Sequence, residues 1–142
     1  MLKEDLNKRV KIVDEVSDWK EAIRLVIEPL EKDGVVNDKY LSAIYDNVAE
    51  NGDYFIIAPN FAMPHTRSEN GALATGLSFL KLRNPVIFSS GQPVTYLMGI
   101  ASKDADTHMD TLAELVEVLM EDGVFERMDQ ANTPEELLEI LS

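Results

Sequence analysis

The sequence predicts a single α/β domain over residues 1–142, in which helices cover both faces of a mixed parallel and antiparallel sheet of about five strands. Three observations predict this three-layer arrangement. The first third of the chain repeats apolar residues at helical spacing, the middle contains short apolar runs separated by turn residues, and the last third is helical again. A chain of 142 residues with 45% hydrophobic content suits one domain with a real core.

The first third is expected to form one strand and two helices. Residues 9–16 (RVKIVDEV) alternate partly and predict a short strand. A helix then starts at Ser17 and stops near Gly34, and a second helix covers residues 39–50 with Asp38 as its cap. The apolar positions are Trp19, Ala22, Ile23, Val26, Ile27 and Leu30 in the first helix, and Leu41, Ile44, Tyr45 and Val48 in the second.

The middle third is expected to form the sheet. β-rich apolar runs alternate there with pairs or triplets of Asn, Gly and Pro, which are typical of turns. The predicted strands span residues 54–58, 75–82, 86–88 and 94–101, and the predicted turns are Pro59-Asn60, Asn84-Pro85 and Gly91-Gln92-Pro93.

The last third is expected to be helical. Residues 102–107 (SKDADT) open a long amphipathic helix that ends at Asp122-Gly123, and residues 124–128 form a further helical turn. Thr133 and Pro134 have the types expected at the cap and first position of a final helix through Leu141. The predicted buried stripe of the long helix is Leu112, Leu115, Val116 and Leu119.

Composition excludes several classes of function. The chain has no cysteine, which rules out disulfides, thiolate zinc sites and cysteine nucleophiles. The net charge of −13 argues against a nucleic-acid or anionic-membrane ligand and is compatible with a basic protein partner. No apolar run approaches the roughly 18 residues that span a bilayer, and the first ten residues contain no signal-peptide region. We therefore expect a cytoplasmic protein without direct membrane insertion.

Familiar cofactor motifs are missing from the sequence. It contains no GxGxxG, no GxxxxGK[ST] and no HExxH, and its two histidines lie 43 residues apart. We therefore predict no nucleotide, no metal and no other cofactor.

His65 is the first candidate functional residue. It lies in the stretch FAMPHTRSENGA, where Pro64 fixes its own backbone and favours an extended conformation before it. If Thr66, Arg67 and Ser68 begin a helical turn, their N–H groups would form an anion site beside the ring. A nucleophilic nitrogen next to an anion site suits phosphoryl transfer, and the alternative is a surface or packing role.

His108 is the second candidate. With Thr107 as the N-cap and Asp110 completing a capping-box variant, it would occupy the first helical position. The helix dipole disfavours a cation there, so the ring should stay neutral and could donate a hydrogen bond to a phosphate. Both histidines follow predicted strand ends, where ligand sites gather, although spacing alone leaves open that they never meet.

The stretches YFIIAPNFAMPHTR and MGIASKDADTHMDTLAELVEVL, with the strand between them, resemble the enzyme IIA domains of the bacterial phosphoenolpyruvate-dependent sugar phosphotransferase system. The resemblance is to the mannitol/fructose type, and APNFAMPH is most similar to its ascorbate-type members. It runs from about Trp19 to Leu141 and implies that residues 1–142 form one type-2 enzyme IIA domain.

The resemblance implies the following roles. His65 would accept a phosphoryl group from the carrier HPr and pass it to a cysteine of enzyme IIB, with His108 assisting. The link to the membrane would run through enzyme IIC, which selects the sugar or sugar-like substrate, with ascorbate as one candidate. The alternative is a regulatory module whose phosphorylation controls a partner protein, and a hydrolase or metal enzyme is a third possibility.

The sequence departs from the mannitol-type members of that family at one point. Those members carry an arginine before the phosphohistidine strand, where this chain reads Ala49-Glu50-Asn51-Gly52-Asp53. Arg67 is the nearest replacement. We therefore expect Arg67, with Thr66 and Ser68, to bind phosphate or to contact the partner.

Overall fold

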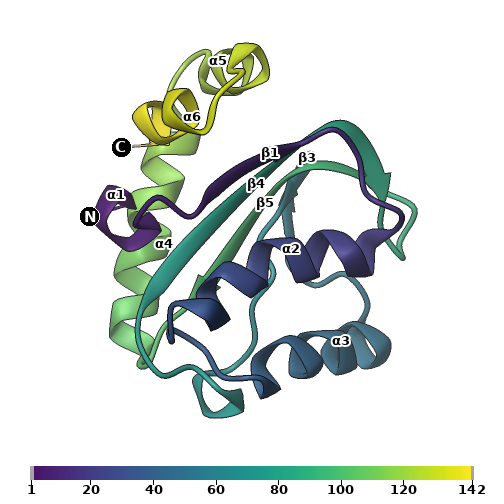
Figure 1. Ribbon diagram of the computed structural model, residues 1–142, viewed down its shortest axis with the longest axis vertical. Helices are drawn as coiled ribbons and strands as arrows, with labels where there is room; N and C mark the ends of the chain where they lie inside the picture. Colours follow the sequence, from purple (N-terminus) through teal and green to yellow (C-terminus); the bar gives the residue numbers. More distant parts are fainter. Residues whose placement is uncertain (1, 142) are drawn as a thin grey trace.

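The computed structural model describes residues 2–141, and the side chains of residues 4–104 and 109–141. Its centre is a five-stranded sheet with the order β1-β4-β5-β3-β2 (Figure 1). β1 pairs with β4 and β3 with β5 in parallel, whereas β4 pairs with β5 and β2 with β3 in antiparallel fashion. The strands are β1 (Val10–Val13), β2 (Ile56–Ala58), β3 (Asn60–Ala62), β4 (Gly76–Ile87) and β5 (Pro93–Ala101).

Helices cover both faces of this sheet. On one face lie α2 (Trp19–Lys32) and α3 (Lys39–Asn51), and on the other lie α1 (Leu2–Leu6), α4 (Ala105–Leu119), α5 (Val124–Gln130) and α6 (Pro134–Leu141) (Figure 1). The predicted fold class, a mixed sheet between two helical layers, is confirmed.

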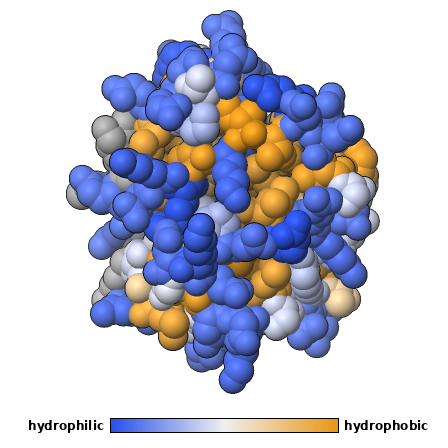
Figure 2. Space-filling model, viewed as in Figure 1, coloured by the Kyte–Doolittle hydropathy of each residue, from blue (hydrophilic) through white to orange (hydrophobic). Residues whose placement is uncertain are grey.

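Two hydrophobic cores result from the alternation of side chains along the strands. In β4, Leu80 and Leu82 pack in the core beneath α2 and α3, whereas Leu77 and Phe79 pack in the core beneath α4, α5 and α6. Full burial of each such side chain contributes about 1.5–3 kcal/mol to the free energy that favours the folded state. Figure 2 shows a surface that is mostly polar, as the net charge of −13 suggests, with apolar patches between α2 and the α5–α6 pair.

The strand predictions need two corrections. β4 runs as one strand through Asn84-Pro85, where the sequence predicts a turn. The β4–β5 register shifts between Lys81 and Val86, so Pro85 sits in the irregular part of the strand, where its missing N–H breaks no regular ladder. In addition, the sequence prediction missed β3, which pairs with β5. The predicted turn at Pro59-Asn60 is confirmed, because these residues lie between the paired positions Ala58 and Phe61 and Asn60 adopts a φ of 65°.

The predicted helices α2, α3 and α6 are confirmed at their expected places in the chain. The predicted N-caps of α3 and α4 need correction. Asp38 makes no side-chain cap, and Asn37 Oδ1 instead accepts from the Lys39 N–H at 2.9 Å. α4 begins at Ala105, so Thr107 lies inside the helix and is not its N-cap, and His108 is the fourth helical residue. Asp104 precedes the helix, and aspartate is more favoured than threonine as the residue before a helix.

The predicted buried stripe of α4 is only partly correct. Leu115 is buried, but Val116 is 48% exposed and Thr111 is buried in its place. Among the described residues 109–119 of α4, Thr111 and Leu115 are the buried ones, so the buried side of this helix is narrow. The short helix α1 was not predicted, because five residues are too few to show a helical period.

Candidate functional site

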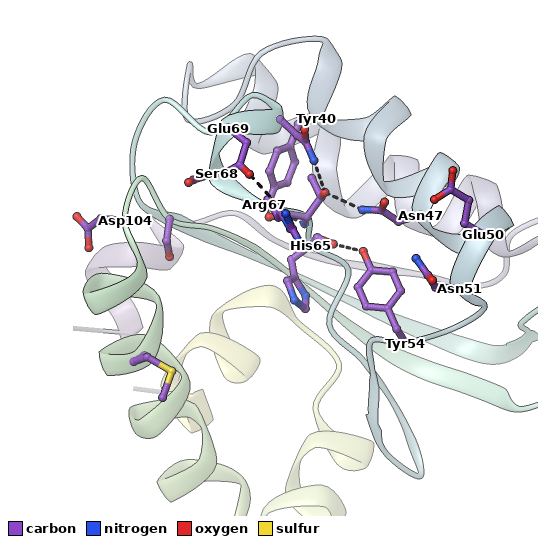
Figure 3. Close-up of a pocket in the computed structure, with 14 residues that line it drawn as sticks. Tyr40, Asn47, Glu50, Asn51, Tyr54, His65, Arg67, Ser68, Glu69 and Asp104 are labelled. Atoms are coloured by element: carbon purple, nitrogen blue, oxygen red, sulfur yellow. Dashed lines mark hydrogen bonds and ion pairs between the residues drawn. The ribbon is translucent and has the colours of Figure 1, made fainter.

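A cavity of about 890 Å³ lies at one end of the sheet, between α3, the segment after β3 and the start of α4 (Figure 3). It forms there because β3 and β5 are parallel neighbours, so the chain leaves both strands at the same edge. The Ile100 N–H donates to the Pro64 carbonyl at 3.4 Å, which ties the two exits together. His65 follows one exit and Ser102 the other, and both line the cavity.

The imidazole of His65 is half-buried and oriented by its own chain segment. Its Nδ1 lies 2.7 Å from the carbonyl oxygen of Met63. Since a carbonyl can only accept, Nδ1 must carry the proton, and in the neutral ring the lone pair then belongs to Nε2. Figure 3 shows the ring directed into the space between Tyr54 and α4. The sequence prediction that His65 occupies a cavity at a strand end is consistent with this geometry.

Tyr54 holds the backbone and the ring of His65 from one side. Its hydroxyl donates to the His65 carbonyl oxygen, and the two rings meet edge-to-face with centroids 5.7 Å apart. Burial raises the pKa of Tyr54, so its hydroxyl keeps the proton that it donates.

Tyr40, from α3, joins the two strand exits. Its hydroxyl donates to the Ile100 carbonyl at 2.6 Å and accepts from the Thr66 N–H at 3.3 Å. Burial raises the pKa of Tyr40 to about 12. The residue after His65 is therefore fixed relative to the end of β5 by a single buried phenol.

Thr66 is also held by its side chain. Its Oγ1 accepts from Asn47 Nδ2 at 2.8 Å and from Asn70 Nδ2 at 2.9 Å (Figure 3). The first amide belongs to α3 and the second to the short 3₁₀ helix η1 (Ser68–Asn70). Since its N–H is taken by Tyr40 and its oxygen receives two amides, Thr66 stabilises the loop that carries His65.

Arg67 and Ser68 lie at the rim of the cavity. The Arg67 side chain is 83% exposed, with Nη1 3.9 Å from Glu69 Oε1, an ion pair that is open to solvent. The helical turn begins at Ser68, whereas the anion-site hypothesis required it to begin at Thr66. Thr66, Arg67 and Ser68 all line the cavity, but the regular amide cradle expected over residues 66–68 does not form.

The described lining is acidic. Glu50, Glu69 and Asp104 contribute carboxylates, and Arg67 is the one permanently cationic side chain among the lining residues that the structure describes. Within the described part of the chain, no group of three or more His, Asp or Glu side chains could hold a metal ion.

His108 lies in the first turns of α4, and its side chain is outside the described residues. Its neighbours Asp104 and Met109 line the cavity, so this part of α4 borders the site. Sequence reasoning missed Tyr40, Asn47, Tyr54 and Ser102. Tyr40 has the helical spacing of a core residue, and the others carry no motif.

Comparison with known proteins relates the chain to one family. Residues 6–142 match the family model described as "Phosphoenolpyruvate-dependent sugar phosphotransferase system, EIIA 2". The chain is 35% identical over 134 residues to the mannitol-specific cryptic phosphotransferase enzyme IIA component of Escherichia coli K12, covering 94% of this chain and 91% of that protein. It is 34% identical over 138 residues to the ascorbate-specific EIIA component of the same organism, covering 95% and 90%.

Solved structures agree with these relatives. The solution structure of the mannitol-specific cryptic enzyme IIA from Escherichia coli superposes with a TM-score of 0.91 at 34% identity, covering 100% of this chain and 99% of that one. A complex of the Escherichia coli mannitol enzyme IIA with phosphorylated enzyme IIB matches with a TM-score of 0.80 at 25% identity, covering 94% of each chain.

Proposed function

Because this chain belongs to the EIIA 2 family of the phosphoenolpyruvate-dependent sugar phosphotransferase system, we propose that His65 is the residue on which it carries a phosphoryl group. As a member of that family, the protein is a phosphotransferase of the enzyme IIA type. The observation that supports His65 is its tautomer: the bond from Nδ1 to the Met63 carbonyl leaves the lone pair on Nε2, on a ring that lines the cavity.

The transfer step follows from this geometry. Nε2 of His65 attacks the phosphorus of a phosphohistidine on the donor, the new N–P bond forms, and the bond between phosphorus and the donor nitrogen breaks. The electron pair of the broken bond returns to the donor ring. Nδ1 of His65 keeps its proton during the attack, and the positive charge that develops on the ring is stabilised by the Met63 carbonyl dipole.

We propose HPr as the donor and a cysteine of enzyme IIB as the acceptor. The solved complex of an Escherichia coli enzyme IIA with phosphorylated enzyme IIB supports the second partner. The excess of carboxylates around the cavity and the net charge of −13 favour partners with a basic face. Among residues 2–141 no helix combines the length and the apolar character that a membrane crossing needs. From membership of the family, we propose that the chain works in the cytoplasm and that enzyme IIC performs the membrane step.

The remaining candidates act around the nucleophile in this proposal. His108 assists by donating a hydrogen bond to the phosphoryl group, and its place near the start of α4 keeps it close to the cavity wall formed by Asp104 and Met109. Arg67 and Ser68 contact the phosphoryl group or the partner from the rim, and Thr66 positions the loop. The relatives are named for mannitol and for ascorbate at nearly equal identity, so the proposed substrate is a sugar or sugar-like compound, ascorbate included.

Phosphorylation in vitro tests the assignment. The protein is incubated with phosphoenolpyruvate, enzyme I and HPr, and its intact mass is then measured. We expect a gain of one phosphoryl group that is labile in acid and stable in base, as a phosphoramidate is. His65→Ala should abolish the gain, whereas His108→Ala should still be labelled. Full labelling of His65→Ala would overturn the assignment.

A further inference from the structure

Ser102 carries a buried hydroxyl that has no hydrogen-bond partner among the residues that the structure describes. The residue is 8% exposed, and its Oγ makes no hydrogen bond with any described residue. Other buried polar side chains of the sheet are paired: Ser78 Oγ donates to the Val26 carbonyl, and Lys81 Nζ donates to three backbone carbonyls near the end of α5. A buried polar group without a partner costs stability, so each one calls for an explanation.

The position of Ser102 supplies that explanation. It is the first residue after β5, and it lines the same cavity as His65. The Ile100–Pro64 hydrogen bond and the Tyr40 bridge fix its segment against the segment that carries His65. The helix α4, which has 15 residues, begins three residues after Ser102. The first N–H groups of a helix have no partner inside it, and the positive end of the helix dipole favours an anion.

We infer that Ser102 Oγ donates a hydrogen bond to an oxygen of the phosphoryl group on His65, an inference that rests on the proposed function of His65. A phosphoryl dianion offers strong acceptors, and a hydroxyl can donate to them without adding charge. This donor matters in this cavity because the one described cationic lining residue, Arg67, is 83% exposed, while three carboxylates oppose an anion. In the resting protein the hydroxyl is shielded from solvent and pairs with no described residue, so a rotation about χ1 must turn it toward the cavity before it pairs with the phosphoryl group.

Because the hydroxyl pairs only in the phosphorylated protein, Ser102→Ala should destabilise the phosphorylated form and not the resting form. Removing an unpaired hydroxyl leaves the resting protein as stable as the parent or more stable. The same change removes a contact from the phosphorylated protein. We expect transfer from HPr to slow roughly ten- to a hundred-fold, the effect of one hydrogen bond to a charged group. Ser42→Ala, an exposed serine of α3 away from the cavity, is the matched control and should transfer as the parent does.

The deciding measurement compares urea unfolding at 25 °C of the resting and phosphorylated forms, with phosphoramidate as a small-molecule donor so that no partner protein intervenes. Phosphorylation should change the urea concentration at the unfolding midpoint of the parent, of Ser42→Ala and of Ser102→Ala. The change toward higher urea should be larger by about 1 M in the parent and in Ser42→Ala than in Ser102→Ala. Equal shifts in all three proteins would overturn the inference. A resting Ser102→Ala protein that is clearly less stable than the parent would also overturn it, because the hydroxyl would then have a partner within the fold.

The two proposals fail in different ways. If the parent takes no label, or if His65→Ala takes it fully, the function proposed for His65 is wrong. If the parent is labelled on His65 and Ser102→Ala behaves as the parent does in both measurements, only the role of Ser102 is wrong.

Discussion

Nδ1 of His65 lies 2.7 Å from the carbonyl oxygen of Met63, two residues earlier in the same segment. The acceptor that sets the tautomer is therefore supplied by the local backbone and not by a remote carboxylate. Pro64 stands between the two residues, and its fixed φ keeps the Met63 carbonyl on the side of the ring. The conformation of three consecutive residues thus determines which nitrogen can attack.

The first prediction concerns that nitrogen. The phosphoryl group should be attached to Nε2 of His65, because Nδ1 holds a proton and is engaged with the backbone. Long-range ¹H–¹⁵N correlation spectra of the phosphorylated protein distinguish the two nitrogens. His108→Ala provides a sample in which His65 gives the one histidine signal. Phosphate on Nδ1 would contradict the tautomer that the Met63 carbonyl imposes.

The second prediction concerns Tyr54. Tyr54→Phe removes the hydrogen bond to the His65 carbonyl but keeps the edge-to-face contact with the ring. We expect transfer from HPr to slow by roughly three- to ten-fold, since a net hydrogen bond is worth about 0.5–1.5 kcal/mol and here it positions the nucleophile. The measurement is kcat/KM for phosphoryl transfer from phospho-HPr.

Tyr45→Phe is the matched control for Tyr54. Its hydroxyl donates to the Lys20 carbonyl at 2.6 Å, a bond of the same kind that lies away from the cavity. The control should lose a similar amount of stability and transfer phosphate as fast as the parent. If the two variants transfer at equal rates, Tyr54 has no positioning role.

The site could be predicted from sequence only where chemistry is visible in a single residue. His65 is a candidate because it follows Pro64 at a predicted strand end, a weak pattern by itself, and because the segments around His65 and His108 resemble one family. Tyr40 could not be found, because its helical spacing predicts a core residue and its two hydrogen bonds depend on how β3 and β5 pair. Ser102 could not be found either, because the lack of a hydrogen-bond partner among the described side chains is a property of the packed structure.

In the fold, too, local sequence patterns predicted some elements, and others depended on how the elements pack. Periodicity was enough for α2, α3 and α6, whose apolar faces repeat over two or more turns. It failed for β4, where Pro85 suggests a turn and only the irregular pairing with β5 accommodates it within a strand. It also failed for Val116, because the width of the side that α4 buries depends on its neighbours.

The third prediction concerns pH and Tyr40. Burial raises the pKa of Tyr40 to about 12, above the value near 10 of an unfolded tyrosine. The folded state therefore binds this proton more tightly, so the associated stability is complete below pH 10 and is lost as the pH rises from 10 to 12. Burial also raises the pKa values of Tyr45, Tyr54 and Tyr96, so the parent should lose stability steeply over this range.

Tyr40→Phe isolates the contribution of that one phenol. At pH 8 the variant should be less stable than the parent, because the Ile100 carbonyl loses its donor. Between pH 10 and 12 the gap in the free energy of unfolding should shrink by on the order of 2–3 kcal/mol. Urea unfolding at several pH values measures it. A gap that stays constant would mean that Tyr40 ionises in the folded protein as easily as in the unfolded chain.

The last prediction concerns Arg67. The resemblance to mannitol-type members implies an arginine upstream of His65, and this chain reads Ala49-Glu50-Asn51-Gly52-Asp53 there. Arg67 lines the cavity, and its weak, exposed ion pair with Glu69 at 3.9 Å leaves the guanidinium able to move. Its planar fork can hold two phosphate oxygens at once, which the point charge of lysine cannot do. We therefore expect Arg67 to contact the phosphoryl group or the donor's phosphohistidine during transfer.

Three variants test this role. Arg67→Ala should slow transfer from HPr by roughly ten- to a hundred-fold, the equivalent of one charge-assisted contact, and Arg67→Lys should fall between it and the parent. Arg83→Ala is the control, because Arg83 is also an exposed arginine in an ion pair, with Asp14, and does not line the cavity. Urea unfolding should show all three as stable as the parent to within about 0.5 kcal/mol, since surface substitutions rarely do more. Should Arg67→Ala transfer as fast as Arg83→Ala, the arginine has no part in transfer, and the negative charge must be met by hydrogen bonds from Ser102 and the start of α4.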